Sequence, residues 1–212
     1  MRILFLDTSS SFLYCGLVSS GNVVFEIKKD LGRDLSQFTL FEIQKKFNEN
    51  KISTDSVDKI ILVNGPGSFT GVRIAITIAK IYGWALNIPV IVISSLQAMA
   101  ASIDNDTNFF VPIIDARRGY CYSAIYDNDL NPILKEQYIN LDTLKVALEK
   151  LGDNYIVISN DSFDFECVKY DPNILKIINT YKDTKEFENI HLINANYLKS
   201  TEAEEKLNDS VN

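Results

Sequence analysis

One order of predicted elements occurs twice in this chain, and this duplication constrains its fold more than any other feature. Residues 3–7 form an apolar segment that ends in Asp7, and residues 111–115 form another that ends in Asp115. A polar turn, a second apolar segment and another turn follow each of them, and then come a predicted helix and a short apolar strand. Two copies of this strand–hairpin–helix–strand unit predict two similar α/β lobes that meet at a cleft.

The predicted helices have amphipathic or apolar patterns, and each copy closes with a short strand. The helices cover residues 34–48, 70–86, 96–101 and 142–151, and the closing strands cover residues 60–63 and 155–158. The boundary between the lobes is expected in the polar stretch 102–108, which gives an N-terminal lobe of residues 1–102 and a C-terminal lobe of residues 103–212. After residue 160 the pattern becomes irregular, and the acidic end, residues 201–212, is expected to fray.

A glycine-rich turn joins the strand at 60–63 to the helix that follows it. The loop contains Gly65, Gly67, Ser68, Thr70 and Gly71. Glycine permits positive φ and close backbone approach, and either Ser68 or Thr70 can cap the helix, whose free amides attract anions. However, the loop lacks the lysine of a phosphate-binding P-loop and is one residue longer than the dinucleotide fingerprint. A tight structural turn is as good an interpretation as an anion site.

Four motifs in a fixed order resemble one family. The segment GPGSFTGVRI is preceded by ILFLDTS and followed by IPVIVISSLQAMA and IIDARRG, a combination similar to the TsaB (YeaZ) family over residues 1–125. The resemblance implies a two-lobed actin-like fold, also called ASKHA or ribonuclease-H-like, and a non-catalytic partner of TsaD. TsaD installs threonylcarbamoyladenosine beside the anticodon of tRNA.

The resemblance also implies a bacterial system with several components. A separate enzyme makes threonylcarbamoyl-adenylate from threonine, bicarbonate and ATP. TsaD, bound to TsaB and assisted by the TsaE ATPase, then transfers the group to adenosine at tRNA position 37. In this system the chain would hold TsaD in its active arrangement, and it would form a homodimer when alone.

The two long N-terminal helices carry more apolar side chains than one buried stripe requires. In the first helix, Phe38 and Phe41 project from the side opposite to the stripe of Leu40, Ile43 and Phe47. The second helix is apolar nearly all round. Its narrow polar strip consists of Arg73, Thr77 and Lys80, and Trp84 falls in the middle of this strip.

Two interpretations of these helices remain open. Either the second helix is enclosed in a large core, or both helices share a surface with a second subunit, with Phe38, Phe41 and Trp84 as aromatic anchors. The resemblance favours the shared surface, because TsaB-like proteins pair with TsaD through these helices and self-associate through the same face.

Asp7 and Asp115 follow apolar strands, where sheet ends place functional groups at clefts. In catalytic actin-like proteins such aspartates orient a nucleotide-bound cation, but each carboxylate can equally accept hydrogen bonds from nearby amides in a turn. The turn is favoured, because residues 8–10 and 116–118 contain no glycine to admit a phosphate. Arg117 belongs to a basic spot near the predicted cleft, for which a solvated turn is the favoured interpretation over a phosphate or carboxylate contact.

The residues that catalysis would need are scarce. His191 is the only histidine, and it is predicted to lie on the surface. A serine nucleophile at Ser68 would need His191 as its base, and the paired histidines that hold the metal of TsaD have no counterpart here. We therefore assign no catalytic residue, metal ligand or cofactor. The rival function is an ATP-dependent phosphotransferase or ATPase of the same fold, which would need glycine-bearing phosphate loops after both strand aspartates.

Composition limits the partners. Acidic residues outnumber basic ones by 28 to 21, which gives a net charge of −7. Nucleic-acid binding usually depends on basic surface, so tRNA is expected to bind only through the complex. The apolar runs are far shorter than the ~20 residues of a membrane span, and the start does not resemble a signal peptide. Three separated cysteines, Cys15, Cys121 and Cys167, favour reduced thiols in a soluble cytoplasmic protein.

Overall fold

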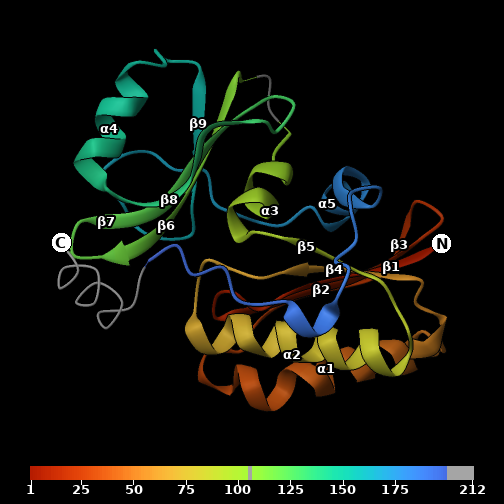
Figure 1. The fold of residues 1–212 in the computed structure, drawn as a ribbon. Helices are drawn as coiled ribbons and strands as arrows, with labels where there is room; N and C mark the ends of the chain where they lie inside the picture. The colour runs from red at the N-terminus through yellow and green to blue at the C-terminus, as the bar shows by residue number, and fades with distance from the viewer. Residues whose placement is uncertain (105–106, 200–212) are drawn as a thin grey trace.

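The computed structural model describes residues 1–104 and 107–199, which fold into two lobes (Figure 1). The first lobe contains a five-stranded sheet of order β3-β2-β1-β4-β5. Its strands are β1 (Arg2–Asp7), β2 (Phe12–Ser19), β3 (Asn22–Asp30), β4 (Lys59–Val63) and β5 (Val90–Ile93). The first three form an antiparallel meander, and β4 and β5 extend the sheet in parallel. The strands β1 and β4 are buried because both faces of the sheet are covered.

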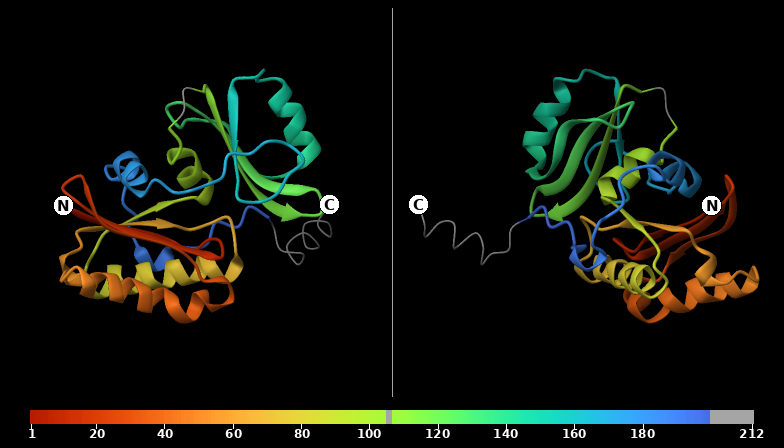
Figure 2. Two further views of the ribbon diagram at one scale, coloured as in Figure 1. Left: turned by 180° about the vertical axis from the view of Figure 1, so that it is seen from behind. Right: turned by 45° about the vertical axis from the view of Figure 1, so that its right-hand side comes forward.

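Two helices cover one face of this sheet. Helix α1 (Leu35–Glu49) and helix α2 (Phe69–Ala85) lie side by side beneath it (Figures 1 and 2). Their buried residues, which include Ile43 and Phe47 of α1 and Ala75 of α2, pack against the strands in one hydrophobic cluster. Short 3₁₀ turns occur at Gly32–Asp34, Thr54–Ser56 and Ile190–Leu192.

The second lobe repeats the first part of this plan. Its four-stranded sheet has the order β8-β7-β6-β9. The strands are β6 (Phe109–Arg117), β7 (Tyr120–Asp127), β8 (Pro132–Asn140) and β9 (Tyr155–Ile158), and α4 (Leu141–Glu149) covers one face. The series β6-β7-β8-α4-β9 thus matches β1-β2-β3-α1-β4 in order and in strand pairing. The predicted duplication of strand, hairpin, helix and strand is confirmed.

Two helices lie between the sheets and join the lobes through a shared core (Figure 1). They are α3 (Ser95–Ala101) and α5 (Ile174–Tyr181). Helix α5 was not predicted, since the stretch after residue 160 looked irregular. It forms because Ile174, Ile177 and Ile178 occupy one face, which packs into the core, while Asn173 caps its first turn.

After α5 the chain returns to the first lobe as a C-terminal strap, residues 190–199, which lies along α2 (Figure 1). The Lys80 Nζ donates to the carbonyl oxygen of His191 at 2.9 Å, and the side chain of Ile193 is buried in the first-lobe cluster. The division into residues 1–102 and 103–212 therefore stays a prediction: the two sheets separate near that point, yet α5 and the strap both contact first-lobe elements. The predicted frayed end, residues 201–212, lies outside the described residues.

None of the helices within residues 1–104 and 107–199 combines the length and the apolar character that crossing a bilayer requires.

Candidate functional site

The glycine-rich loop packs against the turn that follows β1. A Cβ atom at Gly67 would collide with the carbonyl oxygen of Ser9, and one at Gly71 with that of Thr8. The Ser68 amide donates to the Ser9 oxygen at 2.6 Å, and the Thr8 hydroxyl donates to the Gly71 oxygen at 2.6 Å. The glycines thus permit close approach of the chain to itself. This packing fits the interpretation as a tight structural turn, and the anion site stays an untested prediction.

Ser68 caps α2. Its Oγ accepts a hydrogen bond from the Gly71 amide at 3.2 Å, whereas Thr70 is exposed within the first turn. Gly65, at the start of the loop, has a φ of +101° and accepts a hydrogen bond from the Ser95 amide at 2.8 Å. The loop therefore ties the start of α2 to the start of α3.

Both strand aspartates form the predicted turns. Asp7 Oδ1 accepts from the Ser9 amide at 2.7 Å, and Asp115 Oδ1 accepts from the Arg117 amide at 2.8 Å. Their surroundings differ, because Asp7 is only 2% exposed whereas Asp115 lies on the surface. Burial raises the pKa of Asp7 to about 6, and the hydrogen bonds from Ser9 partly oppose this shift.

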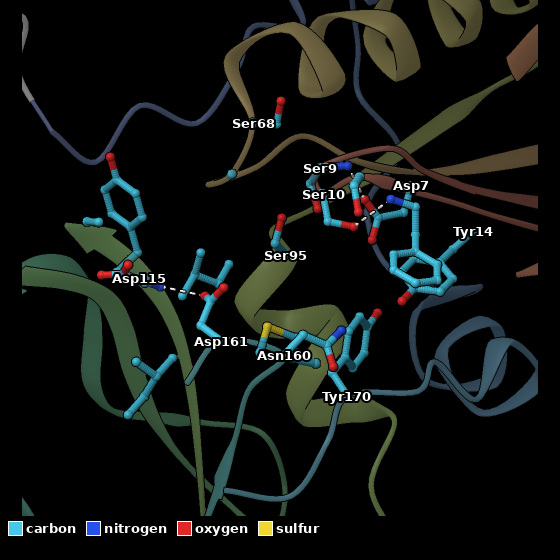
Figure 3. Close-up of a pocket in the computed structure, with 18 of the residues that line it drawn as sticks. Asp7, Ser9, Ser10, Tyr14, Ser68, Ser95, Asp115, Asn160, Asp161 and Tyr170 are labelled. Carbon is cyan, nitrogen blue, oxygen red and sulfur yellow. Dashed lines mark hydrogen bonds between the residues drawn. The ribbon is translucent and has the colours of Figure 1, made fainter. Parts of the chain in front are cut away.

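Asp7, Asp115 and Arg117 line one cleft between the lobes, with a volume of about 670 Å³. Figure 3 shows Asp7 and Asp115 among the residues of this cleft. Asp161, which the sequence patterns did not single out, accepts a hydrogen bond from the Asp115 amide at 2.7 Å and lines the same cleft. Tyr170, also not anticipated, joins it from the loop that precedes α5. The structure thus brings together the three predicted cleft residues, and loops from the irregular region complete the walls.

The predicted aromatic anchors are exposed. Phe38 is 36% exposed, Phe41 58% and Trp84 69%. The exposure of Trp84, which lies in α2, rules out the interpretation of that helix as enclosed on all sides. Leu40 corrects the prediction for α1: it was grouped with the buried stripe but is 49% exposed, because that stripe is centred nearer Thr39. We call Phe38, Leu40, Phe41, Ile81 and Trp84 the apolar helix face.

The polar strip of α2 is partly engaged by the strap. Arg73 Nε donates to the Tyr197 hydroxyl at 3.1 Å, and the Arg73 guanidinium lies 3.9 Å from the centre of the Phe69 ring, which stacks on Tyr197. Lys80 also contacts the strap, through the carbonyl of His191. Only Thr77 of this strip bonds solely within its own helix, to the Arg73 carbonyl at 2.7 Å. Any partner that contacts Arg73 or Lys80 would therefore meet the strap as well.

His191 is exposed, as predicted. Within residues 1–104 and 107–199, no group of three or more His, Cys, Asp or Glu side chains is placed to hold a metal ion. Cys15 and Cys121 are buried, and burial raises the pKa of both thiols.

Comparison with known proteins places the chain in a family. The model of the TsaD family, tRNA N6-adenosine threonylcarbamoyltransferase, matches residues 30–171. The Bacillus subtilis protein named tRNA threonylcarbamoyladenosine biosynthesis protein TsaB is 30% identical over 97% of both chains. The chain belongs to the TsaB family. The Escherichia coli TsaB is 34% identical over 63% of this chain and 58% of its own length.

Solved structures of TsaB-like proteins share the fold. YeaZ from Pseudomonas aeruginosa superposes with a TM-score of 0.74 at 20% identity, and covers 93% of this chain and 100% of its own. A second Pseudomonas aeruginosa structure, of a protein similar to peptidase YeaZ, gives a TM-score of 0.79 at 21% identity, with 93% and 99% covered. The predicted TsaB (YeaZ) family and the two-lobed actin-like fold are both confirmed.

Proposed function

We propose that this chain is a non-catalytic subunit of the system that makes threonylcarbamoyladenosine in tRNA, and that it pairs with and activates a TsaD-type transferase. Membership of the TsaB family supports the pathway. The observation that carries the pairing is the apolar helix face, to which the neighbouring helices α1 and α2 both contribute large exposed side chains.

An exposed apolar face of this kind favours association. A tryptophan buries roughly 150–250 Å² when covered, and covered apolar area contributes about 25 cal/mol per Å². Covering Trp84, which is 69% exposed, thus contributes on the order of 3 kcal/mol before the losses of motion on association. Phe38 and Phe41 add to the same face, and residues of this type are enriched at interface hot spots.

One face for two partners makes their complexes exclusive. In this proposal the chain forms a homodimer when alone, and TsaD replaces the second copy. A TsaE-type ATPase joins the ternary complex, which acts on tRNA in the cytoplasm. With a net charge of −7, this subunit leaves the phosphate contacts to the other components.

The rival function, an ATP-dependent phosphotransferase or ATPase, has less support. Nucleotide phosphates would need open backbone amides at the glycine loop, but the backbone of Thr8 and Ser9 packs against Gly67 and Gly71. The second lobe offers residues 116–118, where Arg117 and Arg118 adopt positive φ in a tight hairpin turn. Neither turn resembles a phosphate cradle.

Reconstitution tests the proposal. The TsaD-type protein of the same genome should co-purify with this chain when the two are co-expressed. Added to TsaD, TsaE and threonylcarbamoyl-adenylate, the chain should raise the rate of tRNA modification, whereas without TsaD it should give none. Equal modification rates with and without this chain, or modification in the absence of TsaD, would reject the non-catalytic role.

A further inference from the structure

The cleft between the lobes contains two buried hydroxyls without partners. Ser95 is 3% exposed and Tyr170 is 7% exposed, and both line the cleft (Figure 3). Neither hydroxyl forms a hydrogen bond of good geometry with a described residue, although the Ser102 side chain lies close to the Tyr170 hydroxyl. A buried polar atom left unpaired costs about 1–3 kcal/mol, so two in one cleft indicate that something else bonds them.

Asp7 adds a buried carboxyl to the same cleft. It is 2% exposed, and it accepts hydrogen bonds from Ser9. No ion pair between described residues includes Asp7. Burying a carboxylate without a cation is unfavourable, and a cation brought by another molecule would offset this cost.

The charged side chains of the cleft favour a positively charged ligand. Asp7, Asp115 and Asp161 line it, and among the described lining residues only Arg117 is basic. The Arg117 side chain is exposed, and its amide is held by Asp115. Three carboxylates against one guanidinium attract a cation and repel phosphates and carboxylates.

The remaining lining suits an organic cation better than a bare ion. Phe12 and Tyr14 stack at 5.3 Å, and Tyr170 meets Tyr14 edge-on at 5.7 Å. Aromatic rings attract ammonium groups and also pack against carbon chains. The volume of about 670 Å³ is in the range of small-molecule sites, about 300–1,000 Å³.

We propose that this cleft binds a primary ammonium group, carried either by a small free amine or by a lysine side chain of another protein. An ammonium has three donors, which match the Asp7 carboxylate and the hydroxyl oxygens of Ser95 and Tyr170. Both hydroxyl oxygens are closed off from solvent, so the groups that cover them must shift before the ammonium can reach them. The site is separate from the apolar helix face and does not depend on pairing with TsaD.

Matched probes test the proposal on the isolated protein. Butylammonium, 1-butanol and butyrate share one carbon chain and differ in charge. In amide NMR titrations at physiological salt, butylammonium should shift the signals of Asp7, Ser95 and Tyr170 and bind at least about tenfold more tightly than 1-butanol, because a hydrogen bond to a charged group is worth about 1.5–3 kcal/mol. Butyrate should leave these signals unchanged. Butanol or butyrate binding as tightly as butylammonium, or no binding by any probe, would overturn the proposal.

Variants test whether butylammonium binding depends on the cleft residues rather than on the net negative charge of the chain. Asp7→Asn and Ser95→Ala should each weaken butylammonium binding about tenfold, whereas Glu26→Gln, an exposed acid outside the cleft, should not change it. If Asp7→Asn does not fold, Ser95→Ala decides, and unchanged binding in Ser95→Ala refutes the site. Nα-acetyl-lysine methylamide distinguishes the sources: tighter binding than butylammonium assigns the ammonium to a protein lysine, and weaker binding assigns it to a free amine.

Discussion

At the scale of single residues, the burial of Asp7 makes the stability of the folded chain depend on pH. Its pKa is raised from 3.8 to about 6 by desolvation. Between these values the folded chain holds a proton that the unfolded chain has lost. The favourable contribution of the protonated carboxyl is therefore fully present below pH 4 and is lost as the pH rises through 6.

Asp7→Asn should raise the free energy of unfolding at pH 7.5. Asparagine keeps an oxygen that accepts from the Ser9 amide but removes the buried charge. A pKa shift of about two units corresponds to at most about 3 kcal/mol at pH 7.5, and the difference from wild type should nearly vanish at pH 4. Urea unfolding at both pH values measures this, and a variant less stable than wild type at pH 7.5 would contradict it.

Gly71→Ala should destabilise the first lobe. The new methyl would meet the carbonyl oxygen of Thr8, so α2 and the turn after β1 must separate. Overpacking of this kind typically costs about 1–3 kcal/mol, measured by urea unfolding. Thr70→Ala, at the neighbouring exposed position, is the control and should change stability by less than about 0.5 kcal/mol. Equal stability of the two variants would show that the close approach of Gly71 to the Thr8 carbonyl does not contribute to the stability of the first lobe.

The features of the site that depend on local spacing could be predicted, and those that depend on tertiary contact could not. The Ser68 cap and the two aspartate turns follow from residues within three positions of one another. The unpaired state of Ser95 and Tyr170 arises only where α3 and the loop before α5 meet between the lobes. No sequence pattern carries that information.

At the scale of elements, the strap and α2 stabilise one another. Tyr197 stacks on Phe69 and accepts a hydrogen bond from Arg73, while the Asn196 amide donates to the Asn64 oxygen at 2.8 Å. These contacts fix the strap along the flank of α2. The strap therefore limits how much of the polar strip a partner can reach.

Tyr197→Ala should loosen the strap more than Tyr197→Phe does. Phenylalanine keeps the aromatic stack and loses only the hydrogen bond, whereas alanine loses both. An exposed aromatic pair and one hydrogen bond are each worth about 1 kcal/mol. Hydrogen exchange at the Ile193 and Asn196 amides should be fastest in the alanine variant, intermediate in the phenylalanine variant and slowest in wild type. Identical exchange in all three would contradict the role of Tyr197.

Elements with long patterns were predictable, and short ones were less so. Helices α1 and α2 differ from their predicted ranges only at the ends. Helix α5 has Ile174, Ile177, Ile178 and Tyr181 at helical spacing, but it spans only eight residues between polar stretches. The exposure of Leu40 depends on how α1 is rotated on its sheet, which periodicity alone places only roughly.

At the scale of the whole molecule, the net charge limits the affinity of the chain for tRNA. With a net charge of −7, the isolated protein should bind tRNA only in the nonspecific range, about 10⁻⁴ to 10⁻⁶ M, with steep salt dependence. Filter binding or fluorescence anisotropy at 50 and 200 mM salt measures this. Nanomolar affinity at physiological salt would show that the subunit itself holds tRNA.

The two-lobed plan was predictable because the pattern of the duplicated unit occurs twice in the sequence. The return of α5 and the strap to the first lobe could not be predicted. Those contacts join residues far apart in sequence, such as Lys80 and His191, and neither end carries a distinctive motif.

The substitution Phe41→Asp tests the central claim most directly, that the apolar helix face is the pairing surface. Phe41 is 58% exposed, so the monomer should stay folded by circular dichroism. A carboxylate in a desolvated interface, together with the loss of an aromatic anchor, should weaken association by at least about thirtyfold, or ~2 kcal/mol. Val146→Asp, which alters a 52% exposed residue of α4 in the second lobe, is the matched control. Sedimentation and co-purification should show that Phe41→Asp loses both the homodimer and the TsaD complex, while Val146→Asp keeps both. A folded Phe41→Asp variant that still forms both complexes would contradict the account.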